Sequence, residues 1–512
     1  MVDHSNTSPL SFSRREIIQI LFGLILAMFL ASLDQTIVAT SLSTMAEDLN
    51  GWGLMSWVVT AYLVASTVTT PIYGRLSDIY GRRPMLLISV GIFAGASVLS
   101  ALSQTMPQLI GARVLQGIGG GGLRSVSQAA VADIIPPRER GKYQGYFSSV
   151  MAVSNVLGPV LGGFFADYLS WHWIFWINLP IGALAFVLCD RNLRRLPRPR
   201  RRAVIDWAGA ALIIAATTPI LFGLSRVETS GGWVQPGVLI PLGIGVLFVA
   251  ALLAWEREAR SPMIPLRLFS NRIFSVATFM MFMMAMVMIA LIILVPLDFE
   301  LAGGLSPDVA GARLIPMTGG TVLGSYIAGQ FVTWTGRYKL YPILGSAGMT
   351  ACCLLIAWFG LGEAVVSDTL LTAGLGLSFG FQLSPVIVPV QNALALEDTG
   401  IGLATVTFFR LIGGAFGVAL LSAQLMGELT SAALAIPGHE ALGPHPGLAL
   451  FHMELAGKAS PALLAALAVA VRSAFTHVFL YAAAISFLSF LGALALKEIP
   501  LRSGAPAVPH RE

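Results

Sequence analysis

Long apolar stretches recur along the whole chain, and they constrain its fold more than any other feature. A membrane-spanning helix needs about 20 mainly apolar residues, and the pattern predicts fourteen such spans. The chain is 56% hydrophobic and only 11% charged, about half the charged fraction of a soluble protein. We therefore predict an all-α integral membrane protein with spans at residues 17–39, 54–74, 84–102, 107–131, 143–166, 171–189, 205–225, 236–255, 273–297, 308–334, 340–360, 367–392, 401–427 and 474–496.

Basic residues are divided unequally between the connections that join these spans. With the N-terminus placed in the cytoplasm, 24 of the 31 Lys and Arg residues fall inside and four fall outside. This asymmetry follows the positive-inside rule, so both termini are predicted to be cytoplasmic. We interpret the Arg-rich run at 191–202 as a topogenic linker rather than a lipid-headgroup or nucleic-acid site, and expect no nucleic-acid partner. Four Lys beside 27 Arg favour a GC-rich bacterial source, and hence an inner (plasma) membrane location.

A carboxylate lies inside the first span, in the stretch MFLASLDQTIVATSL (28–42). An ionised Asp at the centre of a spanning helix costs about 2.5 to 3.5 kcal/mol, so Asp34 needs a reason to be there. The span has no small-residue cleavage site, and we expect it to be retained rather than removed as a signal peptide. Counted from Ile17 at about 1.5 Å per residue, Asp34 lies beyond the midplane toward the outside. Either it binds and releases protons, or it is locked in a structural ion pair.

Two connections share one pattern and indicate an internal repeat. GRLSDIYGRR (74–83) and GQFVTWTGRY (329–338) carry two glycines and an arginine at a constant offset. The halves would be spans one to six and nine to fourteen, giving domains 1–200 and 261–512 around an inserted pair at 201–260. Repeated halves place a substrate site near the midplane where they meet. A long external connection is expected at about 428–472, where PALLAALAVAVRSAF suits either a surface helix or a plain loop.

Two further motifs place unusual residues within spans. RVLQGIGGGG puts Arg113 deep in span four, where a guanidinium that cannot lose its proton needs a partner or a wet cavity. SNVLGPVLGG in span five combines three glycines with a proline, which permits a kink and close helix contact. In the repeated connection, Gly74 and Gly81 allow a tight turn, while Asp78 and Arg82 can form charge-assisted bonds.

Together with LDQTIV (33–38), these motifs resemble the signatures of the major facilitator superfamily, and in particular its fourteen-helix drug/proton antiporter branch. The resemblance covers nearly the whole chain. It implies a major facilitator fold of six, two and six helices, and proton-coupled export of hydrophobic, mainly cationic drugs by alternating access. It also implies protons as the coupling ion with no other cofactor and no metal. The expected partners are a small hydrophobic or cationic substrate and membrane lipid, with the chain acting as a monomer.

The resemblance assigns roles to individual residues. It implies proton coupling by Asp34 and Arg113, a conformational latch of Gly74, Asp78, Gly81, Arg82, Arg83 and Asp133, an antiporter motif of Gly158, Pro159, Gly162 and Gly163, and candidate substrate contacts at Gln35, Asp298, Glu300 and Arg410. Some of these roles have alternatives. Arg113 could only tie helices together, and the two acidic residues of span nine could face external water or form an acidic cavity rim. Arg124, where an apolar residue is expected, and Thr333, at the position that matches Asp78, depart from the pattern.

Three rival functions are weighed against drug export. A lipid exporter of the same fold is the nearest, and a solute importer or exchanger is disfavoured by the span-five motif. A membrane-bound enzyme is disfavoured because the sequence has no nucleotide-binding loop, no metal-spaced cluster and no nucleophile elbow. Cys189, Cys352 and Cys353 lie in or beside spans without metal-ligand spacing, so we interpret them as packing residues.

Overall fold

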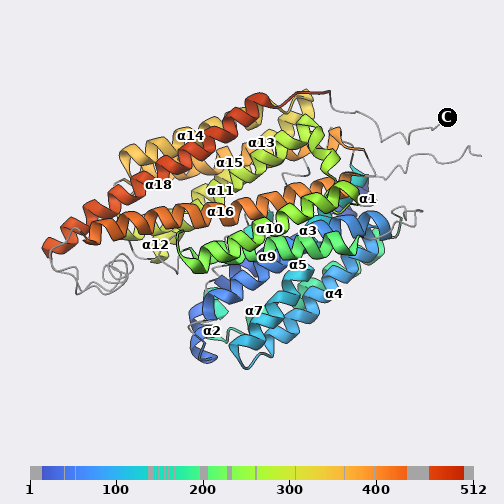
Figure 1. Ribbon diagram of the computed structural model, residues 1–512, viewed down its shortest axis with the longest axis horizontal. Helices are drawn as coiled ribbons and strands as arrows, with labels where there is room; N and C mark the ends of the chain where they lie inside the picture. Colours follow the sequence, from blue (N-terminus) through green and yellow to red (C-terminus); the bar gives the residue numbers. More distant parts are fainter. Residues whose placement is uncertain are drawn as a thin grey trace, which may run out of the picture.

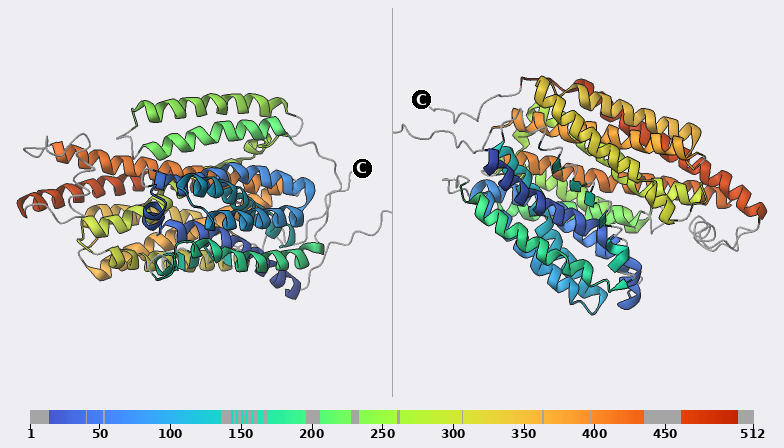
Figure 2. Two further views of the ribbon diagram at one scale, coloured as in Figure 1. Left: turned by 90° about the horizontal axis from the view of Figure 1, so that it is seen from below. Right: turned by 180° about the vertical axis from the view of Figure 1, so that it is seen from behind.

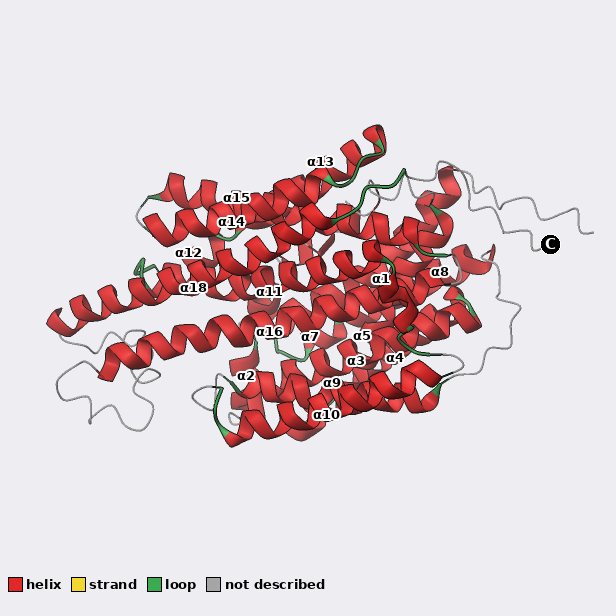
Figure 3. Ribbon diagram, turned by 45° about the horizontal axis from the view of Figure 1, so that its top comes forward, coloured by secondary structure: helices red, strands yellow, loops and turns green. Residues whose placement is uncertain are grey.

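The protein is a bundle of long helices (Figure 1), and no strand occurs among the residues that the structure describes (Figure 3). The computed structural model describes residues 14–39, 41–51, 54–135, 143, 146–147, 150–151, 153–154, 157–158, 161–165, 168–195, 206–227, 233–259, 262–305, 307–362, 364–395, 398–434 and 461–500. An all-helical fold is expected in a bilayer because helices satisfy their own backbone hydrogen bonds.

The N-terminal half and the inserted pair precede residue 260. The half consists of α1 (Arg14–Ala39), α2 (Leu42–Asp48), α3 (Met55–Tyr80), α4 (Arg82–Ala101), α5 (Met106–Ile134), α7 (Trp173–Trp176), α8 (Asn178–Asn192) and the 3-10 turn η2 (Leu193–Arg195). The described residues between 143 and 165 are also helical. The inserted pair is α9 (Trp207–Arg226) and α10 (Pro236–Glu258).

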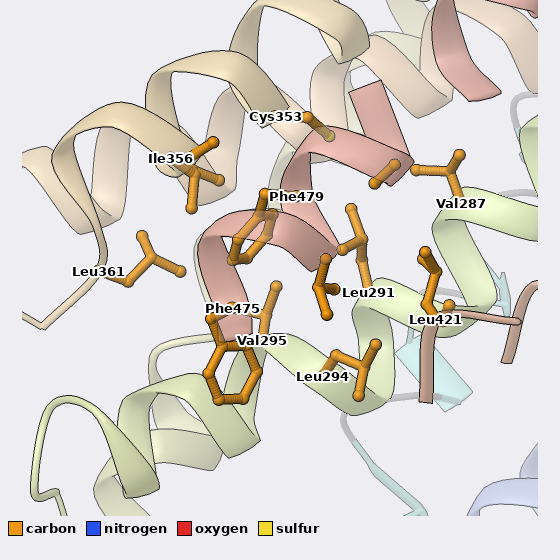
Figure 4. Packing of buried hydrophobic residues seen from close by; sticks show 14 of the residues in the cluster. Val287, Leu291, Leu294, Val295, Cys353, Ile356, Leu361, Leu421, Phe475 and Phe479 are labelled. Atoms are coloured by element: carbon orange, nitrogen blue, oxygen red, sulfur yellow. The ribbon is translucent and has the colours of Figure 1, made fainter. Parts of the chain in front are cut away.

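The C-terminal half follows a short 3-10 turn, η3 (Leu266–Ser270). Its helices are α11 (Arg272–Leu301), α12 (Pro307–Ala312), α13 (Ile315–Thr335), α14 (Leu340–Phe359), α15 (Val365–Ala393), α16 (Thr399–Leu434) and α18 (Pro461–Ala495). Figure 4 shows its core, where Val287, Leu291, Leu294 and Val295 of α11 meet Phe475 and Phe479 of α18.

Helices cover the predicted spans throughout the described part of the chain, and ten of them are long and apolar enough to cross a membrane. The total of fourteen spans and the cytoplasmic termini stay predictions. One boundary was wrong: α16 continues to Leu434 and α18 begins at Pro461, so the connection between them is shorter than the predicted 428–472. PALLAALAVAVRSAF is therefore the start of a long continuous helix, neither a separate surface helix nor a loop. Residues 435–460 lie outside the described part.

Glycine lets the same pair of helices approach closely in each half. A Cβ added at Gly121 of α5 would lie 2.5 Å from the carbonyl oxygen of Ser66 on α3. In the other half, a Cβ at Gly376 of α15 would lie 1.8 Å from the carbonyl oxygen of Met317 on α13. Since lipid gives no hydrophobic drive for helices to associate, this backbone proximity supplies much of the van der Waals packing. The two pairs occupy equivalent positions in the repeat.

The two halves meet through α16, which packs against α3 and α5. The inserted pair forms a layer on one side of the bundle, as the left view of Figure 2 shows. Within that layer α9 contacts both α3 and α16 and therefore covers the seam between the halves, while α10 packs on α9. The rings of Trp57 of α3 and Phe222 of α9 contact each other with centroids 5.1 Å apart and planes tilted by 32°.

Candidate functional site

Asp34 is completely buried at the junction of α1, α5 and α8. Its Oδ2 accepts a hydrogen bond from Nη1 of Arg113 at 2.6 Å. Its Oδ1 accepts one from Nε2 of Gln116 at 2.7 Å and one from Nδ2 of Asn178 at 2.9 Å. The carboxylate thus has a cation and two neutral donors, which offset the desolvation cost of burying it as an ion. The two residues predicted for proton coupling are a direct pair.

A second layer of contacts fixes this cluster. Ser97 of α4 accepts hydrogen bonds from Gln116 at 2.9 Å and from Asn178 at 3.3 Å. The Arg113 Nε donates to the Val58 carbonyl at 3.2 Å, and its guanidinium lies 4.3 Å from the ring centroid of Tyr62. Five helices of one half, α1, α3, α4, α5 and α8, therefore hold the ion pair. A proton on Asp34 would leave a buried guanidinium without its counter-charge, so protonation favours rearrangement of these helices.

Asn178 and Ser97 were missed by the sequence reasoning. Asn178 stands in WINLPIG, where a lone amide within an apolar span is a usable signal. Ser97 carries no such signal, since serines recur throughout span three and only the fold brings this one to Asp34.

The latch residues form a connected network at the opposite end of α3. The Nε of Arg82 donates to Asp133 at 2.7 Å, and its Nη1 donates to Asp78 at 2.5 Å and to the Ser77 hydroxyl at 2.6 Å. The other oxygen of Asp78 accepts from the backbone N–H of Ile401 at 3.0 Å. This last bond joins the two halves, because Ile401 lies in the first turn of α16, where free N–H groups favour a carboxylate.

Glycines bring the two halves into contact at the latch. A Cβ at Gly74 of α3 would lie 2.3 Å from the Ala404 Cβ, and one at Gly400 would lie 2.1 Å from Asp78 Oδ1. Gly81 ends α3 at φ 97°, a conformation that other residues rarely adopt. Arg83 pairs with Asp190 of α8 at 2.5 Å, inside the N-terminal half, and its role in the latch stays a prediction.

The matching connection of the C-terminal half has a different construction. Gly336 ends α13 with φ 68°, as Gly81 ends α3. Thr333 donates to the Gly329 carbonyl of its own helix at 2.9 Å, and Arg337 is exposed. Without a carboxylate at position 333, this connection provides no counterpart of the Asp78 bond among the described residues.

The antiporter motif packs on the outer part of α1, beside Asp34. A Cβ at Gly158 would lie 2.0 Å from the Thr36 hydroxyl, and that hydroxyl donates to the Ser154 carbonyl at 2.9 Å. One turn on, Ser41 donates to the Gly162 carbonyl at 3.0 Å. A Cβ at Gly163 would meet nothing within 4 Å, and Pro159 lies outside the described residues. Span five is therefore positioned to respond when α1 moves.

A small cavity lies between the halves. Its described lining comes from α1, span five and α5 on one side and from α11, α15 and α16 on the other: Met28, Gln128, Phe147, Met151, Met281, Leu383, Ile387, Leu403, Val406, Thr407 and Arg410. At about 1.5 Å per residue, Arg410 lies about 16 Å along α16 from its first residue, a distance of about half the thickness of a hydrocarbon core.

The other candidate substrate residues lie outside this lining. Gln35 accepts a 2.6 Å hydrogen bond from Arg124, so the unexpected arginine of span four is tied to α1 next to Asp34. Asp298 is buried and Glu300 half-buried at the far end of α11, where an ion pair joins Arg313 to Asp368 nearby. Neither acidic residue of span nine reaches the cavity, so the acidic-rim interpretation finds no support in this arrangement.

Comparison with known proteins identifies the family. The profile described as Major Facilitator Superfamily matches residues 24–418. An uncharacterised MFS-type transporter of Mycobacterium tuberculosis is 34% identical over 96% of this chain and 71% of its own length. Multidrug resistance protein 3 of Bacillus subtilis is 33% identical over 78% of each chain, and the efflux pump FUS6 of Gibberella fujikuroi is 35% identical over 80% of this chain and 75% of its own.

Solved structures agree at the level of the fold. A proton:xylose symporter matches with a TM-score of 0.59 and 15% identity, covering 93% of this chain and 96% of its own. The human organic anion transporter MFSD10 matches with a TM-score of 0.59 and 16% identity, covering 94% and 99%. At such identities the likeness concerns the fold alone. The helical bundle, the sequence profile and the relatives lead to one conclusion: the chain is a transporter of the major facilitator superfamily.

Proposed function

We propose that this transporter is a proton-coupled exporter of hydrophobic small molecules. The observation that carries the proposal is the buried Asp34–Arg113 pair, which joins a titratable acid on α1 to a permanent cation on α5. The relatives with efflux and multidrug names support export as the direction. Export works by alternating access, with the cavity between the halves opening to one side at a time.

The proposed cycle uses the contacts described above. With the latch engaged between Asp78 and α16, the cytoplasmic ends of the halves are held together. A proton that arrives from outside neutralises Asp34 and weakens its bond to Arg113, and substrate leaves to the outside. Release of that proton to the cytoplasm restores the pair after the latch has opened. Inward movement of one proton supplies about 2.3 kcal/mol per 100 mV of membrane potential.

Coupling between Asp34 and the cavity runs through α1. Asp34 itself does not line the cavity. Its neighbour Gln35 holds Arg124, and Arg124 lies within electrostatic range of Arg410 in the cavity wall. A movement of α1 that follows protonation therefore shifts charge beside the substrate. The resemblance favours cationic substrates; the charge of the cavity is taken up below.

The Asp34→Asn variant tests the coupling. Asn keeps the size and much of the hydrogen bonding but cannot gain or lose a proton, so we expect the fold and substrate binding to survive while gradient-driven transport disappears. Purified protein in vesicles with an imposed pH gradient would be given hydrophobic dyes of positive, neutral and negative charge. Dye accumulation and dye-dependent proton flux are the measurements.

Asp190→Asn is the matched control, since Asp190 also pairs with arginines in the N-terminal half but does not line the cavity. We expect this variant to transport like the wild type. Dye accumulation against its gradient by Asp34→Asn, with proton flux intact, would remove Asp34 from the mechanism. Dye movement only into the cytoplasmic side would favour an importer instead.

A further inference from the structure

Arg410 is a cation in the cavity wall that no other described residue neutralises. It lines the space between the halves from α16, and it makes no hydrogen bond or ion pair with any described side chain or backbone group. No described residue of the lining is acidic. An arginine in a low-dielectric region is costly without a partner, and its proton cannot be lost to relieve the cost. The described wall of the cavity therefore carries a positive charge without a negative partner.

Arg124 adds a second positive charge close to the first. Its Nη2 donates to two neutral oxygens, Gln35 Oε1 at 2.6 Å and the Ala31 carbonyl at 3.3 Å. Its Nε is buried without an acceptor among the described residues. The field of Arg124 acts on Arg410, so the two like charges repel across the wall. A single anionic group bound near Arg410 would relieve both.

The balance of charge in this part of the membrane is positive. Asp34 neutralises Arg113, and no ion pair joins Arg124 or Arg410 to a carboxylate among the described residues. The remaining lining is apolar and adaptable, with methionines such as Met28, Met151 and Met281, and the neutral polar groups of Gln128 and Thr407. This combination suits a ligand with an apolar body and one charged end.

We propose that the cavity binds amphipathic organic anions, with Arg410 receiving the anionic group and the methionine-rich wall receiving the apolar body. The proposal rests on the exporter function above and names its substrate class. It departs from the cationic class that the resemblance implies. The anion could be a small molecule from the cytoplasm or an anionic lipid of the bilayer, and the test separates the two.

The test is a binding measurement that needs no proton gradient. The full-length protein in nanodiscs of zwitterionic lipid would be dialysed against pyrenebutyrate, pyrenebutanol or pyrenebutyltrimethylammonium, with empty nanodiscs as the blank. These probes share one apolar body and differ in charge. We expect the anion to bind at least about tenfold more tightly than the alcohol, as a charge-assisted hydrogen bond provides, and the cation to bind most weakly.

Variants at position 410 locate the effect. Arg410→Gln should weaken pyrenebutyrate binding about tenfold or more while leaving pyrenebutanol unchanged, and Arg410→Lys should retain most of the preference for the anion. Arg337→Gln, which changes an exposed arginine outside the cavity, is the control. Size-exclusion profiles establish that each variant is folded.

The outcomes of the binding measurement distinguish a lipid ligand, a free anion and a wrong proposal. Displacement of pyrenebutyrate when phosphatidylglycerol is added to the nanodiscs supports the anion site and assigns it to lipid; binding that phosphatidylglycerol leaves unchanged supports it and assigns it to free anions. Wild-type protein that binds the cation as tightly as the anion overturns the proposal without any variant. Retained anion binding in Asp34→Asn alongside lost transport would separate this site from the coupling mechanism.

Discussion

At the scale of single residues, the stability of the protein depends on whether each buried charge has a partner. Asp34 has Arg113, Gln116 and Asn178 around it, and its environment is closed. The structural alternative for this residue, an ion pair, and the functional one, a proton site, are compatible, since a pair that is broken by a proton is a switch. The quantity to measure is the free energy of unfolding that depends on the Asp34–Arg113 pair.

Removal of one partner should be far worse than removal of both. Arg113→Met leaves a buried carboxylate without its cation and should cost about 3–5 kcal/mol of stability. Asp34→Leu combined with Arg113→Met should recover most of that loss while transport stays absent. Thermal unfolding midpoints of the purified variants measure the difference. Arg83→Met is the control, because its pair with Asp190 is partly exposed and such pairs contribute about 0–1 kcal/mol.

A wild-type midpoint for Arg113→Met would contradict this account. It would mean that Asp34 finds another counter-charge or water once the guanidinium is gone. The double variant then serves as the check that the cluster still folds around apolar side chains.

At the scale of helices, close approach decides which movements are possible. The α3–α16 contact depends on Gly74 and Gly400, where added side chains would collide with Ala404 and with Asp78. The motif predicts that Gly74 belongs to the latch. It did not identify the surface it meets, because Ala404 lies more than three hundred positions away and carries no local signal.

Gly74→Ala should prevent full closure of the cytoplasmic ends. The added Cβ would lie 2.3 Å from the Cβ of Ala404, and overpacking of this kind costs about 1–3 kcal/mol in the closed state. Transport should fall by about tenfold, with binding in nanodiscs retained. Adding Ala404→Gly removes the colliding atom and should restore most of the rate, which efflux assays in vesicles would measure.

Gly91→Ala controls for the general effect of replacing a helical glycine. A Cβ at Gly91 meets nothing within 4 Å, so this variant gains the same helix propensity without a collision. If Gly74→Ala transports as fast as Gly91→Ala, close contact at this point is not needed for the cycle.

Much of the helix plan was predictable, and the contacts between distant elements were not. Hydropathy located the helices because each span must be apolar over its own length, and the resemblance assigned Arg82 and Asp133 to one latch, where the two form an ion pair. The pairing of Arg83 with Asp190 and of Arg124 with Gln35 depends on which helices become neighbours. Periodicity within one span contains no information on that choice.

At the scale of the whole transporter, charge movement connects the cavity to the energy source. If one proton enters while one monovalent anion leaves, two elementary charges move inward per cycle, worth about 4.6 kcal/mol per 100 mV. If a monovalent cation leaves instead, the exchange moves no net charge. The chemistry of the cavity thus sets the response to membrane potential.

Export of pyrenebutyrate from vesicles should therefore accelerate when a potassium gradient and valinomycin make the cytoplasmic face negative. The rate at fixed pH on both sides is the measurement, with pyrenebutanol, whose exchange for one proton moves a single charge, as the internal comparison. An anion flux that does not change with potential would contradict a one-for-one exchange with protons.

The position of α9 has a consequence for how hydrophobic compounds reach the transporter. A two-half transporter without inserted helices exposes both of its flanks to the lipid, and dissolved compounds can enter from either side. Here α9 contacts both α3 and α16 and so covers the seam between the halves on one flank. A compound that reached the seam between the halves from within a leaflet would therefore have to approach it from the opposite flank.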